Sequence, residues 1–409
     1  MLSFLVVGGG LAVGTAALFA AAAKALRGFY TYKYQVPGLV MWLSGTVVMV
    51  AIKYVARGSK PRFPECTFTG ELKQSVMRCL SAHYMEDIVQ PENAAYLRGM
   101  METSINQSSG AAAREAGVST QFFSFNGLEH IWLRAKDSDT IEKKHRVVIL
   151  YLHGGGFALG CPALYIPMTG YMQHCIREQL AQRLGDDVNV EVLLANYRKA
   201  PQFPYPRPPQ DAYTMYKYLL DEEKLLPSQI MVMGDSAGGG LTMATLLRAR
   251  DEDPSLLPAA AILSCPMVDR SYKGDDRDTP YCMLAADGIE AFWNAYLPSK
   301  RYDEPSTWGD ASPVHCDLSG LPPVYIQAAE FDYLLPHAMT LYDKAKKAGL
   351  TTWTLEIERH VSHAFTSAPR SDWPTAAQSL DKMSVFAATQ LARAVLAQNG
   401  NGGKPVESR

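Results

Sequence analysis

The sequence lacks any surplus of charge of one sign, since 39 lysines and arginines stand against 41 aspartates and glutamates. It therefore lacks the basic field that nucleic-acid binding requires, and no nucleic-acid partner is expected. The sequence also lacks the composition of a disordered chain, because 47% of its residues are hydrophobic and only 20% are charged. A globular protein that binds a neutral or apolar small molecule fits this composition best.

The seven cysteines lack the pattern of a metal site, because they are scattered and contain no C-x-x-C pair. We therefore expect no metal. An odd number of cysteines excludes complete intramolecular pairing, and buried free thiols are the favoured interpretation. One or two disulfides are left open for the case of an oxidising compartment.

The amino terminus contains two long uncharged runs. Residues 2–23 carry no charge and are long enough for a helix to cross a bilayer, and a second uncharged stretch covers 34–52. Basic residues follow the first run instead of preceding it, which favours an uncleaved anchor over a cleaved signal peptide. We expect residues 1–60 to be a membrane anchor of one or two apolar transmembrane helices that contacts membrane lipid. A sequon at Asn106 would carry a glycan only if the following domain faces a lumen.

Beyond this anchor, β-branched runs alternate with helical patterns, which predicts a mostly parallel sheet with helices on both faces. The expected strands are 146–152, 189–197, 229–233, 259–264, 324–328 and 352–357. The expected helices are 165–185, 210–223, 236–250, 337–349 and 373–396.

Two regions interrupt the alternation and are too long for ordinary connections. We expect 61–125 to form a helical cap segment and 126–396 the catalytic domain, with a cap insertion at about 269–308. The last residues, 397–409, have the composition of a disordered tail.

One motif has the form of a nucleophile elbow. Gly234, Asp235, Ser236, Ala237 and Gly238 follow a predicted strand and open a predicted helix, which is the context that G-x-S-x-G requires. Glycines two residues on either side of the serine allow a sharp turn without Cβ clashes. A phosphate loop is the competing interpretation, but the Lys-Ser/Thr of a Walker motif does not follow.

A second motif follows the predicted strand 146–152. His153, Gly154, Gly155 and Gly156 form a glycine-rich turn without the G-x-G-x-x-G spacing of a dinucleotide site. Consecutive glycines allow backbone N–H groups to point at one oxygen. We expect the N–H groups of Gly155, Gly156 and Ala237 to form an oxyanion hole.

A serine nucleophile needs a base, and the base needs an acid that orients it. Both partners are expected downstream of Ser236, on loops that follow strands. Asp332 follows the predicted strand 324–328 and His363 follows 352–357. The predicted triad is therefore Ser236, Asp332 and His363.

Other residues compete for these roles. His360 is an alternative base, Glu330 is an alternative acid, and Asp287 is a more distant candidate for the acid. His315 and His337 are interpreted as structural.

The run HGGGF at 153–157, followed by GDSAGG at 234–239, resembles the hormone-sensitive-lipase branch of the α/β-hydrolases. That branch includes arylacetamide deacetylases and fungal steryl acetyl hydrolases. The segment 197–206, YRKAPQFPYP, is similar to the family's Y-R-L-A-P-E-x-P-F-P, with Lys199 in place of Leu and Gln202 in place of Glu. His337 and Ala364 also depart from the family pattern.

The resemblance implies an α/β-hydrolase fold with a helical cap and a serine esterase that needs no cofactor. It implies an acyl-enzyme mechanism on short-chain, acetyl, esters of lipophilic alcohols such as sterols or secondary metabolites. By the same resemblance the protein is expected at the endoplasmic-reticulum membrane. An amidase with the same triad and a non-catalytic ligand-binding protein are the alternatives. The ester itself, the membrane topology and a homodimer are left undetermined.

Overall fold

An eight-stranded sheet forms the centre of the protein, with the strand order β1-β2-β4-β3-β5-β6-β7-β8. The computed structural model describes residues 36–135, 145–185, 188–274, 278–298, 301–367 and 373–401. From β4 to β8 neighbouring strands run parallel, as the alternation of strands and helices predicts. The parallel strands are β3 (His145–Leu152), β4 (Val188–Ala195), β5 (Ile230–Asp235), β6 (Ala260–Ser264), β7 (Val324–Ala329) and β8 (Thr354–Glu358).

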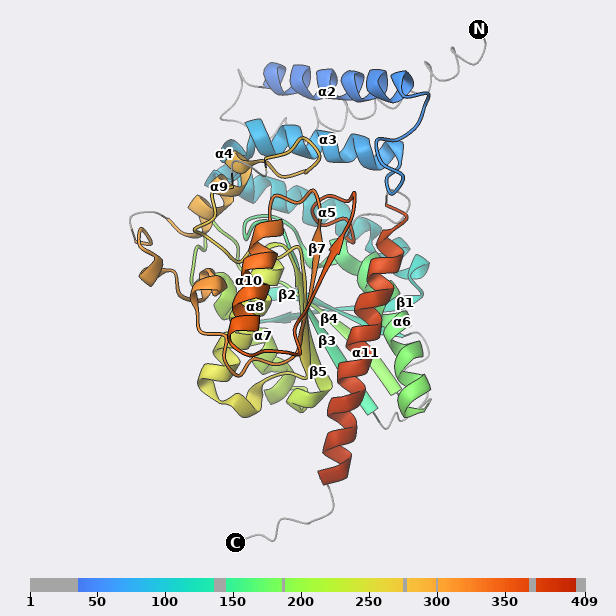
Figure 1. Cartoon of the computed structure of the whole chain (residues 1–409), viewed down its shortest axis with the longest axis vertical. Coiled ribbons are helices and arrows are strands. Elements are labelled where there is room, and N and C mark those ends of the chain that lie inside the picture. Colours follow the sequence, from blue (N-terminus) through green and yellow to red (C-terminus); the bar gives the residue numbers. More distant parts are fainter. Residues whose placement is uncertain are drawn as a thin grey trace.

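Helices cover both faces of this sheet (Figure 1). Alternate residues of β3 show why the strand is apolar throughout. Val148, Leu150 and Leu152 pack toward α7 (Arg207–Asp221) and α8 (Ala237–Glu252). Val147, Ile149 and Tyr151 pack toward α6 (Ile166–Leu184) and α11 (Ala376–Asn401) on the other face. A strand buried on both faces needs apolar side chains in both directions. Helix α10 (Leu335–Lys347) packs beside β7 and β8.

The sheet begins earlier than the sequence predicted. Strands β1 (Val118–Phe125) and β2 (Leu128–Ala135) form an antiparallel hairpin, and β2 pairs antiparallel with β4. Residues 118–125 therefore belong to the sheet and not to the helical cap. The strands are joined by Asn126 and Gly127, both with positive φ, as a two-residue hairpin turn requires. That N-G turn was the signal that the sequence analysis missed.

The regions predicted as cap contain helices. The first holds α3 (Phe68–His83), α4 (Met85–Ile88) and α5 (Pro91–Glu115), and the second holds α9 (Ala286–Tyr296). Helix α2 (Val36–Ala56) lies in the region predicted as the anchor. Figure 1 shows α2 and α3 stacked above the rest of the molecule, with α4 and α9 close together beneath them. At the other end of the chain, α11 continues to Asn401, so residues 397–401 are helical where a disordered tail was predicted. Residues 402–409 of that predicted tail lie outside the described residues.

Among the helices of the described residues, none combines the length and the hydropathy that spanning a bilayer requires. The first predicted span, 2–23, lies outside the described residues. The second, 34–52, falls on α2, so its prediction as a transmembrane helix is not supported. Helix α2 instead packs along α3, where Val47 and Val50 are buried and the Tyr54 ring lies 4.6 Å from that of Phe68.

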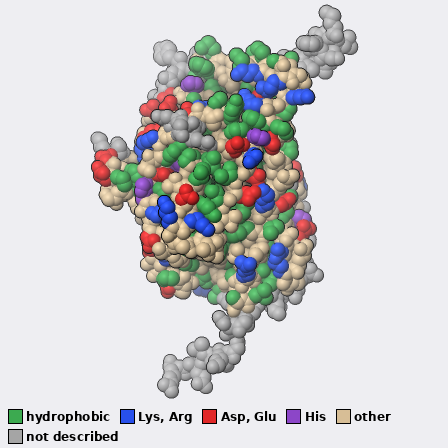
Figure 2. Space-filling model, viewed as in Figure 1, with side chains coloured by type: hydrophobic (Ala, Val, Ile, Leu, Met, Phe, Trp, Pro, Cys, Tyr) green, Lys and Arg blue, Asp and Glu red, His purple; other side chains and the backbone are tan. Residues whose placement is uncertain are grey.

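The opposite side of α2 is apolar and exposed. Met41, Val48, Ile52 and Val55 recur every three to seven residues, and each is more than half exposed. Figure 2 shows hydrophobic side chains along the top of the molecule, with Lys and Arg side chains beside them. A helix that is apolar all round is normally buried on all sides, so this outward face, which we call the α2 stripe, is unusual for a surface.

All seven cysteines lie in the described residues, where none forms a disulfide, and five of them are buried. This agrees with the interpretation of the cysteines as free thiols.

Candidate active site

Ser236 lies at the junction of β5 and α8, as the elbow motif predicts. Its φ of 53° and ψ of −119° are outside the comfortable regions for an L-residue, and neighbouring backbone holds this strain. Its N–H donates to the Ser264 carbonyl at 2.8 Å, and its own carbonyl accepts from the N–H of Met267 at 2.9 Å. A Cβ at Gly234 or Gly238 would collide with nearby backbone, so the turn requires glycine at both positions.

The glycine turn after β3 has positive φ at Gly155 and Gly156, at 116° and 61°. A Cβ at Gly155 would meet the backbone of Leu159, and one at Gly156 would meet the ring of Phe292 in the cap helix α9. The turn is therefore tightly enclosed, and the cap packs directly against it. Removing the glycines would both strain the backbone and displace the cap.

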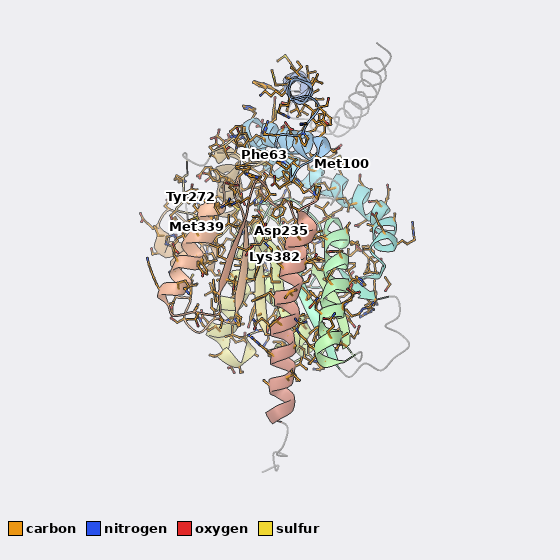
Figure 3. All side chains as sticks on the ribbon, turned by 45° about the vertical axis from the view of Figure 1, so that its right-hand side comes forward. Phe63, Met100, Asp235, Tyr272, Met339 and Lys382 are labelled. Carbon is orange, nitrogen blue, oxygen red and sulfur yellow. The ribbon has the colours of Figure 1, made fainter. Side chains whose placement is uncertain are left out.

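Asp235 joins this turn to the elbow. Its carboxylate is fully buried and accepts from the Gly154 N–H at 2.8 Å, the Tyr151 hydroxyl at 2.8 Å and the Tyr165 hydroxyl at 3.0 Å. Burial raises the pKa of the Asp235 carboxyl, and the hydrogen bonds from the two tyrosines partly oppose this. Figure 3 labels Asp235 in the middle of the molecule. Sequence reasoning placed Asp235 in a supporting role but missed both tyrosines, which no motif marks.

His153 stabilises the glycine turn after β3. Its ring stacks on Tyr197 with a centroid separation of 4.4 Å, and its Nδ1 lies 2.8 Å from the Gly154 carbonyl. Burial, reinforced by the charge of Lys199, lowers the pKa of His153 to about 3. The ring is therefore neutral near pH 7 and has a structural role.

Asp332 and His363 meet on the loops after β7 and β8. His363 Nδ1 lies 2.8 Å from Asp332 Oδ2, and both side chains are more than nine-tenths buried. The carboxylate can only accept, so Nδ1 carries the proton and Nε2 is left to act as a base. Asp332 Oδ1 accepts from the Leu334 N–H at 2.9 Å, which fixes the carboxylate on its own loop.

Contacts through β6 connect this pair to the elbow. Ser264, which holds the Ser236 backbone, also shares a hydrogen bond of 3.2 Å with the hydroxyl of Thr366 on the histidine loop. The following residue, Cys265, has its sulfur within 4.8 Å of the ligand atoms of Asp332 and His363. Strands β5, β7 and β8 are parallel, so their carboxyl ends bring Ser236, Asp332 and His363 to the same side of the sheet.

Cys265, Asp332 and His363 also have the composition of a metal-ligand set. Burial and the Asp332 carboxylate, however, raise the pKa of the Cys265 thiol well above its ordinary value. A metal ligand must be a thiolate, and Asp332 is already bonded to His363. The group fits a hydrogen-bonded acid and base better than a metal site.

The alternative base and acid are bonded elsewhere. His360 Nδ1 lies 3.1 Å from Glu65 Oε1, and its ring stacks on Phe63. Glu330 accepts from the His360 N–H at 2.8 Å. These two residues hold each other and the start of the cap. His363 and Asp332 instead hold each other after the carboxyl ends of β8 and β7, on the side of the sheet where β5 leads into Ser236.

The remaining candidates have structural positions. His337 Nδ1 accepts from the N–H groups of Val268 and Asp269, and burial lowers its pKa to about 4. His315 lies 3.5 Å from Asp269. Asp287 lies at the start of α9, on a groove of about 480 Å³ between α3, α4 and α9. None of the three predicted triad residues lines that groove.

These features are those of a hydrolase with a serine elbow, an acid–base pair and a glycine turn on a mostly parallel sheet. A family model described as the alpha/beta hydrolase fold matches residues 149–367, more than half of the chain, so the chain belongs to this family. The predicted hormone-sensitive-lipase-like branch is confirmed. A crystal structure described as an esterase from the bacterial hormone-sensitive lipase family superposes with a TM-score of 0.60 at 27% identity, covering 79% of this chain and 98% of that one.

Curated relatives point in the same direction. The chain is 35% identical over 204 residues to an acetyl-hydrolase of Streptomyces hygroscopicus, covering 49% of this chain and 62% of that protein. It is 29% identical to the carboxylesterase NlhH of Mycobacterium tuberculosis, covering 62% of this chain and 76% of that protein. It is 28% identical to the arylacetamide deacetylase of Oryctolagus cuniculus, covering 37% of this chain and 38% of that protein.

Proposed function

We propose that the protein is a serine carboxylesterase that removes short acyl groups, above all acetyl, from lipophilic alcohols. The observation that carries the proposal is the buried hydrogen bond between His363 Nδ1 and Asp332 Oδ2, on the sheet edge where strained Ser236 also lies. The names of the relatives, acetyl-hydrolase and carboxylesterase, support the substrate class. The near-zero net charge agrees with a neutral ester.

In the proposed mechanism, His363 Nε2 takes the proton of Ser236 as its hydroxyl attacks the ester carbonyl. Asp332 holds the imidazole in the tautomer with Nδ1 protonated and stabilises the imidazolium that forms. The N–H groups of Gly155, Gly156 and Ala237 bind the oxyanion. His363 then protonates the leaving alcohol, and water hydrolyses the acyl-enzyme with His363 again as the base.

The test compares the parent with Ser236→Ala on p-nitrophenyl acetate, butyrate and decanoate. We expect turnover by the parent, greatest on the short esters, and loss of nearly all activity in Ser236→Ala. A fluorophosphonate probe should label the parent and not the variant. Equal activity in both proteins, or labelling at another residue, would overturn the proposal.

An amidase is the second candidate, because one relative carries the name arylacetamide deacetylase. Paired assays on an acetate ester and an acetanilide with the same aryl group separate the two. A higher kcat/KM on the anilide would make amide cleavage the principal activity.

We further propose that the enzyme works at a membrane surface, that of the endoplasmic reticulum, with the α2 stripe against the lipid. Support comes from the spacing of Met41, Val48 and Ile52 on one exposed side of α2, and from exposed Lys53 and Lys60, which suit anionic headgroups. The uncharged run 2–23 would bring α2 to the bilayer. A helix that lies in the interface needs an apolar face but need not span.

Activity on an ester carried in vesicles tests the lipid contact. We expect the full-length triple variant Met41→Ser, Val48→Ser, Ile52→Ser to lose activity on an ester dissolved in anionic vesicles while keeping activity on soluble p-nitrophenyl acetate. The control is Leu226→Ser with Leu396→Ser, which alters two side chains of similar exposure elsewhere. Equal vesicle activity in both variants would contradict the lipid contact, and a lipid-free dimer lost only in the triple variant would assign the stripe to a second copy.

A further inference from the structure

The segment that leads into α9 touches the loop of the proposed acid. Cys282 is fully buried, and its sulfur accepts the N–H groups of Tyr333 and Leu284, each at 3.3 Å. Its thiol points at Asp332 Oδ1 with a sulfur–oxygen distance of 3.9 Å. Cys282 therefore contacts the carboxylate oxygen that His363 leaves free.

The next residue reaches the loop of the proposed base. The Met283 N–H donates to the Ser362 hydroxyl at 3.0 Å. Ser362 is buried and immediately precedes His363. Two consecutive residues of one cap segment thus hold the acid loop and the base loop.

The same segment is fastened to the cap helix α3. The Ala285 N–H donates to the Ser81 hydroxyl at 2.9 Å, and Arg78 donates to the Leu284 carbonyl. Arg78 also forms an ion pair with Asp278 at 2.7 Å. Movement of α3 or α9 would therefore be transmitted to residues 282 and 283.

We infer that Cys282 and Ser362 are positioning residues, through which seating of the cap sets the geometry of the Asp332–His363 pair. The inference rests on the proposed function, since it assigns Asp332 and His363 as acid and base. With the segment seated, Oδ1 receives the Leu334 N–H and the Cys282 thiol, and Oδ2 lies 2.8 Å from His363 Nδ1. With the segment lifted, the carboxylate loses a donor and its loop is free to turn.

The thiol can act as this donor throughout the working pH range. Burial and the adjacent Asp332 carboxylate raise the pKa of Cys282 to about 12, so it remains protonated. A charge-assisted hydrogen bond to a buried carboxylate is stronger than one between neutral groups.

The test uses Cys282→Ala and Cys282→Ser on a soluble acetate ester. We expect Cys282→Ala to lower kcat about tenfold, the effect of one hydrogen bond to a charged group, with KM changed less than about twofold. The acid limb of kcat/KM should move to higher pH, because Asp332 with one donor fewer stabilises the His363 imidazolium more. Cys282→Ser keeps a donor and an acceptor and should recover part of kcat. Cys161→Ala, which removes another buried thiol, is the control.

Ser362→Ala tests the hydrogen bond between Met283 and Ser362. It also replaces Cys282→Ala as the test if that variant does not fold. It should lower kcat and shift the same pH limb. The double variant should lose less than the product of the single losses, because both residues hold one segment. The inference is overturned if Cys282→Ala, or Ser362→Ala in its place, matches Cys161→Ala in kcat and pH profile. Equal activity of the parent and Ser236→Ala would instead sink the proposed function, whatever the cysteine variants do.

Discussion

The backbone N–H of Gly154 and the carboxylate of Asp235 are joined by a hydrogen bond of 2.8 Å. This bond connects two glycine-rich turns about 80 residues apart in the chain, and the hydroxyls of Tyr151 and Tyr165 bind the same carboxylate. One buried side chain thus connects the turn that carries Gly155 and Gly156 to the elbow that carries Ser236.

Asp235→Asn should lower kcat by about ten- to a hundredfold, because the amide presents N–H groups where the carboxylate accepts, and small displacements of catalytic groups are costly. Assays on p-nitrophenyl acetate measure the effect. Asp381→Asn is the control, since Asp381 also accepts a tyrosine hydroxyl, that of Tyr171 at 2.7 Å, but on the surface. Full activity in Asp235→Asn would show that the turn holds its position without this bond.

Gly156→Ala should lower kcat/KM more than about tenfold, since the new methyl group would meet Phe292 and strain a backbone with φ of 61°. Gly349→Ala is the control, because it introduces backbone strain without a steric clash. Gly349 has a φ of 78° but no atom near its Cβ position, so that variant should lose about 1 kcal/mol of stability and no activity. Similar kinetics in both variants would contradict the crowding argument.

Lys199→Leu should stabilise the protein at neutral pH. Lys199 is buried, its amine contacts the oxygens of Asn196 and Tyr197, and burial lowers its pKa to about 8 from 10.5. Between these values the unfolded chain binds more protons than the folded one, so stability of the parent rises with pH. The variant should gain on the order of 3 kcal/mol below pH 8 from removal of this charge, less any lost hydrogen bonding.

Urea unfolding at pH 7 and at pH 10 measures this difference. The advantage of Lys199→Leu over the parent should shrink as the pH rises from about 8 to 10.5. A difference that stays constant between the two pH values would mean that the amine does not titrate differently in the folded state.

His363→Ala should lower kcat roughly 10⁴-fold or more, the loss typical of a missing base. His360→Asn should keep kcat within about twofold, because asparagine tolerates the φ of 57° at that position and the ring lies against Phe63. Kinetics on one soluble ester compare them. A large loss in His360→Asn together with an active His363→Ala would exchange the two roles.

Much of the fold was predictable because its strands are buried on both faces and its turns carry glycine. The ranges predicted for β3 to β8 differ from the observed strands by a few residues, since continuous β-branched runs mark them clearly. The hairpin of β1 and β2 was missed because its strands mix polar and apolar residues at an edge of the sheet. The predicted spanning role of 34–52 is not supported, because hydropathy does not reveal that one side of α2 packs on α3.

The site was predictable only where a motif carries the geometry. The elbow and the glycine turn are local, so their residues follow from spacing along the chain. The choice between His360 and His363, three residues apart, depends on which one meets an aspartate from another strand. Tyr151, Tyr165 and Cys282 are marked by no pattern, because their roles arise from contacts between segments distant in sequence.

Strand β8 is the last strand at one side of the sheet, and this position predicts how the protein loses activity on heating. Edge strands open at lower free energy than central ones, and His363 follows the edge strand whereas Ser236 follows a strand in the middle of the sheet. On heating, β8 should therefore open first and move the His363 imidazole out of place. The protein would then stop hydrolysing ester while it still keeps most of its circular dichroism signal.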